Sequence, residues 1–589
     1  MARLDPHSYA DDTQPRVVSL SWDARVSFDR RVLDAEATLT LDAPGRGPLD
    51  LDTRDLTVRG ARDDQGREVP FALAPADPIL GAKLTLSLAE GTRAVTLSYS
   101  TSPEASALQW LTPAQTAGGA QPYLFSQCQA IHARSVIPLQ DTPRHRITFT
   151  ASLTVPAPLR ALMAAAHVSR EVTGDVAVER WEMPQAIPPY LIALAVGELA
   201  SRELGPRSRV WAEPSVVDAA AWEFEGVEAM MAAGEALFGP YAWDRYDILV
   251  MPPSFPYGGM ENPRLTFVTP TLLAGDRSQV RVIAHELAHA WSGNLVTNAD
   301  AQHFWLNEGW TRYAEIRIVE AIEGEDMAAL SSALCRKGLD DAVARFRAQG
   351  RPELTRLRVS LEGVDPDDAF SEVPYDKGNL FLRAIEARVG RPRFDAFARA
   401  YFDAHRFTSI TTDAFIAFAQ RELPGALEAV RWREWVDGEG VPDDAPVTRS
   451  AMLDRVEALG SAAPDDAAGR AMSSTEWQLY LDRLPRETDH ALLRDLDARF
   501  ALSQTGNMEV KVAWLELALA SGYAPALPEV ERVLCAVGRM KYLKPLYDGL
   551  LARAETRPVA ASTFERAAEG YHPIARAVIR ARIERALGR

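Results

Sequence analysis

Two histidines separated by three residues form the most chemically informative pattern in this sequence, His285-Glu286-Leu287-Ala288-His289. Residues four apart lie on one face of a helix, so both imidazoles are expected to reach the same metal ion. Glu308 follows after eighteen more residues and adds a carboxylate. Two histidines and one carboxylate are the ligands of a catalytic zinc, whose fourth position stays open for water. Glu286 is the expected general base for that water.

The alternative explanation of the His-Glu-x-x-His pattern is a surface helix with a salt-bridged glutamate. The position of Glu308 argues against it, because this residue lies within the compact segment Trp305-Leu306-Asn307-Glu308-Gly309 at a suitable distance from the histidines. The pattern therefore indicates a zinc hydrolase that binds one Zn²⁺ per chain.

Length and charge restrict the class of protein. A chain of 589 residues is too long for a single core, so about three domains are expected. The net charge of −17 argues against nucleic acid and anionic membranes as partners. Three scattered cysteines suggest a reducing compartment. The polar start with Pro6 does not resemble a signal peptide, and no apolar stretch is long enough to cross a bilayer. We expect a cytoplasmic protein.

The hydrophobic pattern changes twice along the chain and predicts a multidomain α+β protein. Alternating apolar and polar residues predict strands over 17–197, and spacings of three and four residues predict helices from 201 to 440. The zinc helix is predicted from near Ser278 to beyond Trp291, with Gly293-Asn294 as its stop signal. Pro442 and Pro446 suggest a linker. The predicted parts are a β domain (1–200), a catalytic domain (201–441), a linker (442–454) and a helical domain (455–589), the last with helices over 477–484, 491–502, 510–520, 528–537, 543–552 and 573–587.

Four other segments carry residues that suit a peptide-binding cleft, although each also has a structural explanation. Glu261 follows the pair Gly258-Gly259 and suits an ammonium group, but a solvated glutamate after a turn has the same pattern. Tyr375 suits an oxyanion, or a purely structural contact. The segment 127–132 carries polar residues in a strand-like setting, which an ordinary edge strand also explains. Arg539-Met540-Lys541 carries two cations near the start of a late helix, which a solvated basic helix face also explains.

Taken together, these motifs resemble the leukotriene A(4) hydrolase/aminopeptidase branch of the gluzincin M1 aminopeptidases, and the resemblance spans essentially the whole chain. The strings that carry it are the segments 107–113 (ALQWLTP), 123–132 (YLFSQCQAIH), 257–262 (YGGMEN), 285–294 (HELAHAWSGN), 304–309 (FWLNEG), 373–378 (VPYDKG) and 538–541 (GRMK). The family implies an N-terminal saddle-like β domain, a thermolysin-like catalytic domain and a C-terminal α-helical superhelical, armadillo-like domain.

The resemblance also implies a role for each matching residue. His285, His289 and Glu308 match the zinc ligands, Glu286 the base, and Tyr375 the group that stabilises the oxyanion. Glu261 matches the residue that binds the substrate's free α-amine, and Arg539 with Lys541 matches the site for the terminal carboxylate of a short peptide. The remaining substrate-binding positions implied by the family motifs are Gln127, Gln129, Tyr257, Gly258, Gly259, Met260 and Asp367.

One departure from the family pattern separates two possible activities. The mammalian members that open a lipid epoxide have a tyrosine five residues before the catalytic tyrosine, and this chain has Phe370 there. Asp367 matches the acid that those members use to direct water onto the epoxide. We therefore expect a plain aminopeptidase acting on short peptides with a free N-terminus. The alternatives are a bifunctional enzyme that also hydrolyses leukotriene A(4) and a non-catalytic peptide-binding protein. The expected oligomeric state is a monomer, with a dimer as the alternative.

Overall fold

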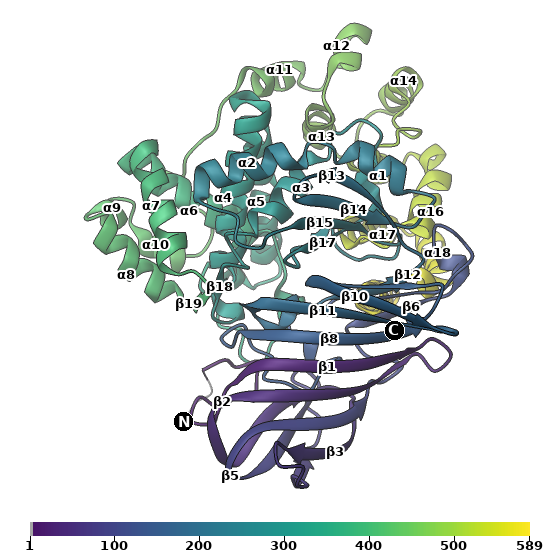
Figure 1. Cartoon of the computed structure of the whole chain (residues 1–589). Helices are drawn as coiled ribbons and strands as arrows, with labels where there is room; N and C mark the ends of the chain where they lie inside the picture. Colours follow the sequence, from purple (N-terminus) through teal and green to yellow (C-terminus); the bar gives the residue numbers. More distant parts are fainter. Residues whose placement is uncertain (1–3, 589) are drawn as a thin grey trace.

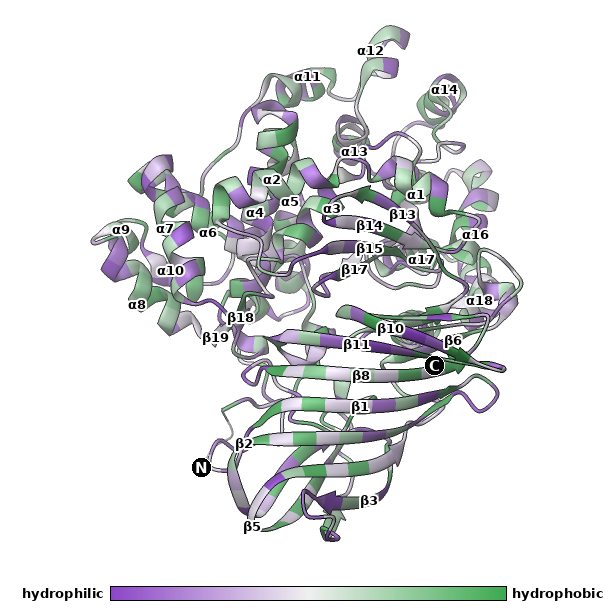
Figure 2. Cartoon of the chain, viewed as in Figure 1, coloured by the Kyte–Doolittle hydropathy of each residue, from purple (hydrophilic) through white to green (hydrophobic). Residues whose placement is uncertain are grey.

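The computed structural model describes residues 4–588, which run from a strand-rich N-terminal part through a mixed central part to a helical C-terminal part (Figure 1). This order confirms the predicted α+β architecture. The N-terminal part has an eight-stranded sheet whose strands alternate hydrophobic and hydrophilic residues, as Figure 2 shows along β1 (Val17–Ser27). In spatial order its strands are β10 (Ala166–Thr173), β11 (Val176–Ile187), β8 (Ile147–Pro156), β1, β2 (Val32–Thr53), β5 (Ala82–Ser100) and β3 (Thr57–Asp63), with β4 (Phe71–Leu73) on β5.

A smaller sheet joins the N-terminal part to the central one. Its strands are β6 (Leu108–Leu111), β7 (Tyr123–Ser126), β12 (Leu194–Gly197) and β9 (Arg160–Met163). The segment 127–132, for which an edge strand was the alternative explanation, lies directly after β7 and is not a strand. It contacts the central part, because the Gln129 amide donates to Glu261 and Nε2 of His132 lies 2.9 Å from Oδ2 of Asp367.

The prediction that the segment after residue 201 is helical is wrong for its first part, because residues 200–268 include a five-stranded sheet. Three of its strands are parallel and almost fully buried, so they appear in the sequence as short apolar runs without alternation. The strands are, in spatial order, β13 (Ala200–Gly205), β14 (Ser208–Ala212), β15 (Tyr246–Val250), β17 (Leu265–Val268) and β16 (Gly259–Met260).

Helices follow this sheet and carry most of the candidate site. α3 (Val280–Ala288) packs on α4 (Trp305–Glu323), and α4 packs closely on α6 (Val373–Val389). The close approach of α4 and α6 depends on two glycines: a Cβ on Gly309 would lie 2.8 Å from the Cα of Gly378. Any side chain at either position would push the two helices apart.

The C-terminal part consists of helices that pack in two rows. α11, α13, α15, α17 and α19 contact one another in succession, while α12 contacts α14 and α16 contacts α18. This arrangement agrees with the predicted superhelical domain, and each of the six predicted helices overlaps an observed one. The helices are α11 (Ala451–Leu459), α12 (Asp466–Ala471), α13 (Ser474–Arg483), α14 (His490–Phe500), α15 (Met508–Ala520), α16 (Leu527–Ala536), α17 (Met540–Ala552), α18 (Arg557–Ala567) and α19 (Pro573–Leu587). Among residues 4–588, none of the helices has the length and apolar character needed to cross a membrane.

Candidate active site

The zinc helix is shorter than predicted, because α3 ends at Ala288 rather than beyond Trp291. His289 is its C-cap, and the chain then turns so that the Gly293 amide donates to the Val296 carbonyl (2.8 Å). Gly293 has φ of 93°, a conformation that favours glycine. A Cβ at this position would also lie 2.4 Å from Oδ1 of Asn307. The tight turn after α3 therefore brings the two histidines close to the start of α4.

The three predicted metal ligands lie together. Nε2 of His285 and Nε2 of His289 are 3.4 and 3.7 Å from the same Oε2 atom of Glu308. That oxygen is buried and has no hydrogen-bond partner among the described residues. A buried carboxylate oxygen between two imidazole nitrogens is costly unless a cation binds it. The donor set therefore fits one zinc ion.

Contacts behind the histidines orient both rings for metal binding. Nδ1 of His285 lies 3.0 Å from Oε2 of Glu315, and Nδ1 of His289 lies 3.1 Å from the Ser292 carbonyl. The Ser292 carbonyl can only accept a hydrogen bond, and the same holds for the Glu315 carboxylate when it is ionised. Each Nδ1 therefore carries the hydrogen, and each Nε2 keeps its lone pair for the metal. Although burial alone would raise the pKa of Glu315, the Arg312 and Arg281 guanidiniums hold it well below its ordinary value.

Replacing Glu315 with glutamine is expected to weaken zinc binding by about 10- to 100-fold, the usual effect of losing the partner of a metal-bound histidine. The substitution removes the ionised acceptor that orients His285. Competition with a chromophoric chelator would measure the zinc affinity. Glu320→Gln is a suitable control, because Glu320 also lies on α4 and pairs with an arginine but does not contact His285. Equal affinities in the two variants would contradict the orienting role.

Two further glutamates lie beside the metal ligands. Both Glu286 and Glu261 are buried, and together with His289 they place ligand atoms within 4.8 Å of one another. Burial raises the pKa of each carboxyl to about 8, and the neighbouring Glu308 contributes to both shifts. A cation bound nearby acts in the opposite direction and favours the ionised forms. The site is therefore an acidic cluster that gains from binding positive charge.

The Gly258-Gly259-Met260-Glu261 segment supports this cluster through close packing. A Cβ on Gly259 would lie 2.2 Å from Oε1 of Glu286, and a Cβ on Gly258 would lie 2.7 Å from Nη2 of Arg539. The Gln129 amide donates to Oε1 of Glu261 (3.2 Å), and the Gln127 amide lies 3.4 Å from Sδ of Met260. The paired glycines thus allow both Glu286 and Arg539 to approach the segment that carries Glu261.

Tyr375 lies in the first turn of α6, next to the metal ligands. Its ring stacks on His285, with 5.9 Å between ring centroids and 22° between planes. The Phe370 ring packs against both Tyr375 (5.8 Å) and Tyr257 (6.2 Å) and is 43% exposed. Tyr375 is thus positioned to face a group bound at the metal, and Phe370 lies at a more accessible position beside it.

Arg539 comes from the C-terminal part, and backbone hydrogen bonds from Gly538 and Met540 to Pro253 and Pro256 fix its approach to the central part. Its Nη1 donates to Oε1 of Glu509 (3.1 Å), and Nζ of Lys541 donates to the other oxygen of that carboxylate (2.6 Å).

The charges around Glu509 do not cancel fully. Although burial favours the neutral acid, Lys541 and Arg539 lower the pKa of Glu509 to about 2. Two cations therefore share one carboxylate, and Nε of Arg539 is buried with no hydrogen-bond partner in the described part of the chain. This arrangement has one net positive charge and a free donor.

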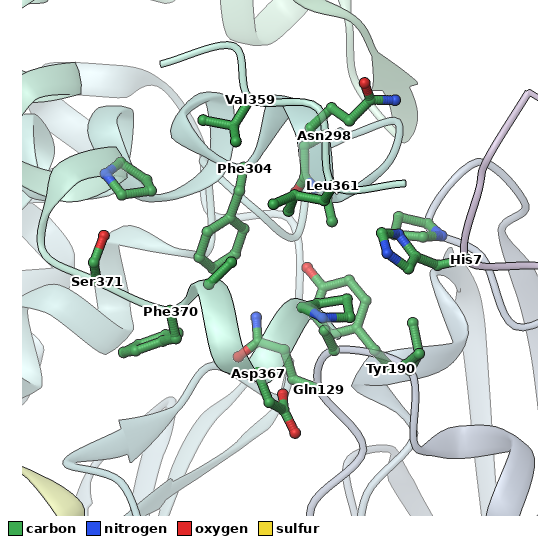
Figure 3. A pocket seen from close by; sticks show the side chains of 18 of the residues that line it. His7, Gln129, Tyr190, Asn298, Phe304, Val359, Leu361, Asp367, Phe370 and Ser371 are labelled. Carbon is green, nitrogen blue, oxygen red and sulfur yellow. The ribbon is translucent and has the colours of Figure 1, made fainter. Parts of the chain in front are cut away.

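Next to Tyr375 lies a largely apolar pocket, shown in Figure 3, whose lining includes Tyr257, Phe304, Leu357, Val359, Leu361 and Phe370. Asp367 also lines it, and Oδ2 of this residue lies 2.9 Å from Nε2 of His132. Although burial alone would raise the pKa of Asp367, the neighbouring His132 keeps it below its ordinary value. The pocket thus contains an ionised carboxylate within apolar walls.

All the predicted site residues lie in or directly around this cluster, pocket and arginine site. Sequence reasoning missed three supporting residues, Glu315, Glu509 and His132. Glu315 follows Glu308 by seven residues, two helical turns along the same face of α4, and that spacing was a usable signal. Glu509 and His132 have no such signal, because each meets its partner only through tertiary contacts.

Comparison with known proteins identifies the family. Family models match residues 6–191 (Peptidase M1 N-terminal domain), 222–435 (Peptidase family M1 domain) and 472–583 (Leukotriene A4 hydrolase, C-terminal). The chain is 38% identical to Leucine aminopeptidase 2 of Yarrowia lipolytica, over 94% of this chain and 88% of that protein. It is 36% identical to Leukotriene A-4 hydrolase of Xenopus laevis, over 97% of each.

Solved structures agree with this assignment. The fold matches the yeast LTA4 hydrolase in complex with bestatin with a TM-score of 0.91 and 33% identity, over 99% of this chain and 97% of the other. An M1 zinc metallopeptidase from Deinococcus radiodurans shares the fold over 75% of this chain and 98% of its own, with a TM-score of 0.59 and 22% identity. The chain therefore belongs to the M1 family of zinc aminopeptidases, within the branch that has a leukotriene A4 hydrolase C-terminal domain.

Proposed function

We propose that this enzyme removes residues from the free N-terminus of short peptides. The observation that carries the proposal is the buried Glu261 carboxylate, which lies beside the metal ligands and gains from binding a cation. A substrate's α-ammonium group supplies that cation. A blocked amine leaves the carboxylate desolvated and unpaired, which is costly, so binding selects a free N-terminus.

His285, His289 and Glu308 would hold the zinc ion, which when bound would polarise the scissile carbonyl and lower the pKa of a water molecule. Glu286 accepts the proton from that water and returns it to the leaving amine. Tyr375 donates a hydrogen bond to the oxygen on which negative charge develops. Both side chains lie within the ligand cluster or stack on it, which supports these roles.

Glu261 would set the position of the substrate's first residue, and the neighbouring side chains would contact it. Gln129 donates to Glu261 and also lines the pocket with Tyr257 and Asp367, which suits contacts with the first side chain. Gly258, Gly259 and Met260 would place backbone next to the peptide, and Gln127 would support that segment through Met260.

Arg539 and Lys541 would hold the carboxylate at the far end of a short peptide. The free Nε donor and the single net positive charge left after pairing with Glu509 suit one carboxylate. With Glu261 binding the amine, the two charged sites would measure peptide length, and tripeptides are the expected best substrates.

Arg539→Ala is expected to lower kcat/KM on tripeptides by a factor equivalent to about 1.5–3 kcal/mol in free energy. This is the usual contribution of a hydrogen bond to a charged group. Aminoacyl arylamides have no terminal carboxylate, so their hydrolysis should barely change. Steady-state kinetics on both substrate types would measure the difference. Arg532→Ala, on the exposed side of α16, is the control. Equal losses on both substrates would show that Arg539 has only a structural role.

A second candidate activity is hydrolysis of a lipid epoxide. The observation that favours it is the apolar pocket with the ionised Asp367 beside Tyr375, because an apolar chain fits the walls and the carboxylate suits a base that directs water. Phe370 offers no hydroxyl at the neighbouring position. Direct assay with leukotriene A4 separates the two activities: formation of the dihydroxy acid supports a bifunctional enzyme, and intact epoxide with active peptide cleavage supports the aminopeptidase alone.

We further propose that the enzyme acts in the cytoplasm as a monomer, with a dimer as the alternative, and without nucleic acid or membrane partners. The net charge of −17 and the free, dispersed cysteines Cys128, Cys335 and Cys535 support this proposal.

A further inference from the structure

Arg312 is a charged residue on α4 whose contacts extend to two sides of the active site. It follows the metal ligand Glu308 by four residues, so both side chains leave the same face of the helix. Its Nη1 donates to Oε2 of Glu315, the oxygen that also lies 3.0 Å from Nδ1 of His285. The arginine therefore contacts the carboxylate that orients a metal-binding ring.

The same guanidinium also reaches α6. Its Nε lies 3.1 Å from Oδ1 of Asp376, which directly follows Tyr375 in the sequence. Its Cζ lies 5.7 Å from the centroid of the Tyr375 ring, within the range of a cation–π contact. Among residues 4–588, Arg312 is the only cation that forms an ion pair with Asp376. The charged link between α4 and the first turn of α6 thus depends on one side chain.

Burial makes this link a geometric constraint more than a source of stability. The side chains of Glu315 and Asp376 are 1% and 5% exposed, and that of Arg312 is 19% exposed. Buried ion pairs contribute little stability beyond apolar packing of the same volume, but removing one partner leaves an uncompensated charge. The two carboxylates therefore hold the guanidinium in one place, and the guanidinium fixes the first turn of α6. Tyr375 lies on that turn, with its ring stacked on His285.

We propose that Arg312 is a positioning residue for the reaction. By pairing with Glu315 and Asp376, it fixes the Tyr375 hydroxyl relative to the metal-binding ring of His285, so that the hydroxyl meets the oxygen on which negative charge develops. A displacement of about 1 Å at such a group can cost about 10²-fold in rate. The inference rests on the proposed role of Tyr375 and extends it, because it names the residue that places this hydrogen-bond donor.

Two substitutions interrupt the link at different points. Asp376→Asn keeps the shape of the side chain and removes the charge on α6, while the contact of Arg312 with Glu315 remains. Arg312→Lys keeps the positive charge on α4, but an ammonium group lacks the planar set of donors that reaches two carboxylates. The first variant isolates the α6 side of the link, and the second is an independent test if the first does not fold.

Arg317→Lys is the matched control. Arg317 is buried on the same helix, its Nη1 lies 2.7 Å from Oδ1 of Asp395, and its Cζ lies 5.8 Å from the centroid of the Tyr313 ring. It thus makes the same kinds of contact as Arg312, but with residues outside the candidate site. Thermal unfolding should show similar losses of stability in the two lysine variants, so a difference in their activity reports the position of the arginine and not the folding of the protein.

Turnover of an aminoacyl arylamide by the zinc-replete variants is the first readout. We expect Asp376→Asn and Arg312→Lys to lower kcat by about 10- to 100-fold, the usual effect of losing an outer partner at a metal site. KM should change little, because the Tyr375 hydrogen bond forms mainly in the transition state. Arg317→Lys should retain the wild-type kcat, and Asp376→Asn should retain one zinc per chain.

Binding of an α-aminophosphonate is the second readout, since its tetrahedral anionic oxygens resemble the oxyanion. Calorimetry on the full-length zinc enzyme gives Kd for the wild type, Asp376→Asn, Tyr375→Phe and the double variant. Each single substitution should weaken binding by about tenfold or more, as the loss of a hydrogen bond to a charged group allows. The double variant should bind no more weakly than Tyr375→Phe, because without the hydroxyl there is no donor left to position.

Four results would overturn the inference. They are wild-type kcat in both Asp376→Asn and Arg312→Lys, an equal loss of kcat in Arg317→Lys, loss of zinc from Asp376→Asn, and a weakening by Asp376→Asn that is as large without the Tyr375 hydroxyl as with it. Failure of the proposed function appears separately: unchanged kcat and phosphonate affinity in Tyr375→Phe alone would remove the tyrosine from the mechanism, and the positioning role with it.

Discussion

Glu286→Gln is expected to lower kcat by about 10²- to 10⁴-fold, the usual contribution of a positioned general acid or base. Glutamine has nearly the same size as glutamate but cannot accept the proton from water. The variant should keep its fold and bind one zinc per chain, because the three metal ligands are unchanged. Turnover of an aminoacyl arylamide, with zinc content measured on the same sample, tests this expectation.

The control for this variant is Glu320→Gln, which makes the same chemical change on α4 away from the ligand cluster and should retain full activity. Near-normal turnover in a zinc-replete Glu286→Gln enzyme would rule out Glu286 as the base. A variant that has lost zinc as well would indicate that Glu286 supports the metal site.

His289→Ala is expected to reduce the zinc content from one ion per chain towards zero and to abolish metal-dependent turnover. The substitution leaves only His285 and Glu308, and two ligands do not satisfy the tetrahedral preference of zinc. Elemental analysis after dialysis against a chelator-free buffer measures the loss.

His303→Ala is the appropriate control, since His303 bonds Thr412 outside the ligand cluster and should leave the zinc content unchanged. A His289→Ala variant that retained its zinc after dialysis would show that the ion is held elsewhere.

Local spacing predicted the parts of the fold whose residues alternate or repeat within one element. The long strands of the N-terminal sheet and the C-terminal helices have such patterns. The buried parallel strands β14, β15 and β17 do not, because both of their faces are covered and the apolar run lacks a period. The early end of α3 was also missed, because the helix ends at Ala288, five residues before the Gly293-Asn294 stop signal.

The residues of the candidate site also fall into two groups, those that the sequence predicted and those that only tertiary contacts reveal. His285, Glu286 and His289 follow from helix spacing, and the resemblance to a family added Glu261, Tyr375 and Arg539. Supporting contacts between distant segments, such as Glu509 with Arg539 or His132 with Asp367, had no counterpart in any single stretch of sequence. These partners determine which groups are ionised, so the electrostatics of the site could be described only from the structure.

The most direct test of the account is to compare a tripeptide with its N-acetylated form as substrates for the zinc-replete enzyme. The buried Glu261 should bind only the free amine, so the unblocked tripeptide should lose its first residue while the acetylated form stays essentially intact. Chromatography of the products measures both rates on the same enzyme sample. Efficient cleavage of the acetylated tripeptide would contradict the central claim that Glu261 makes this zinc enzyme an aminopeptidase.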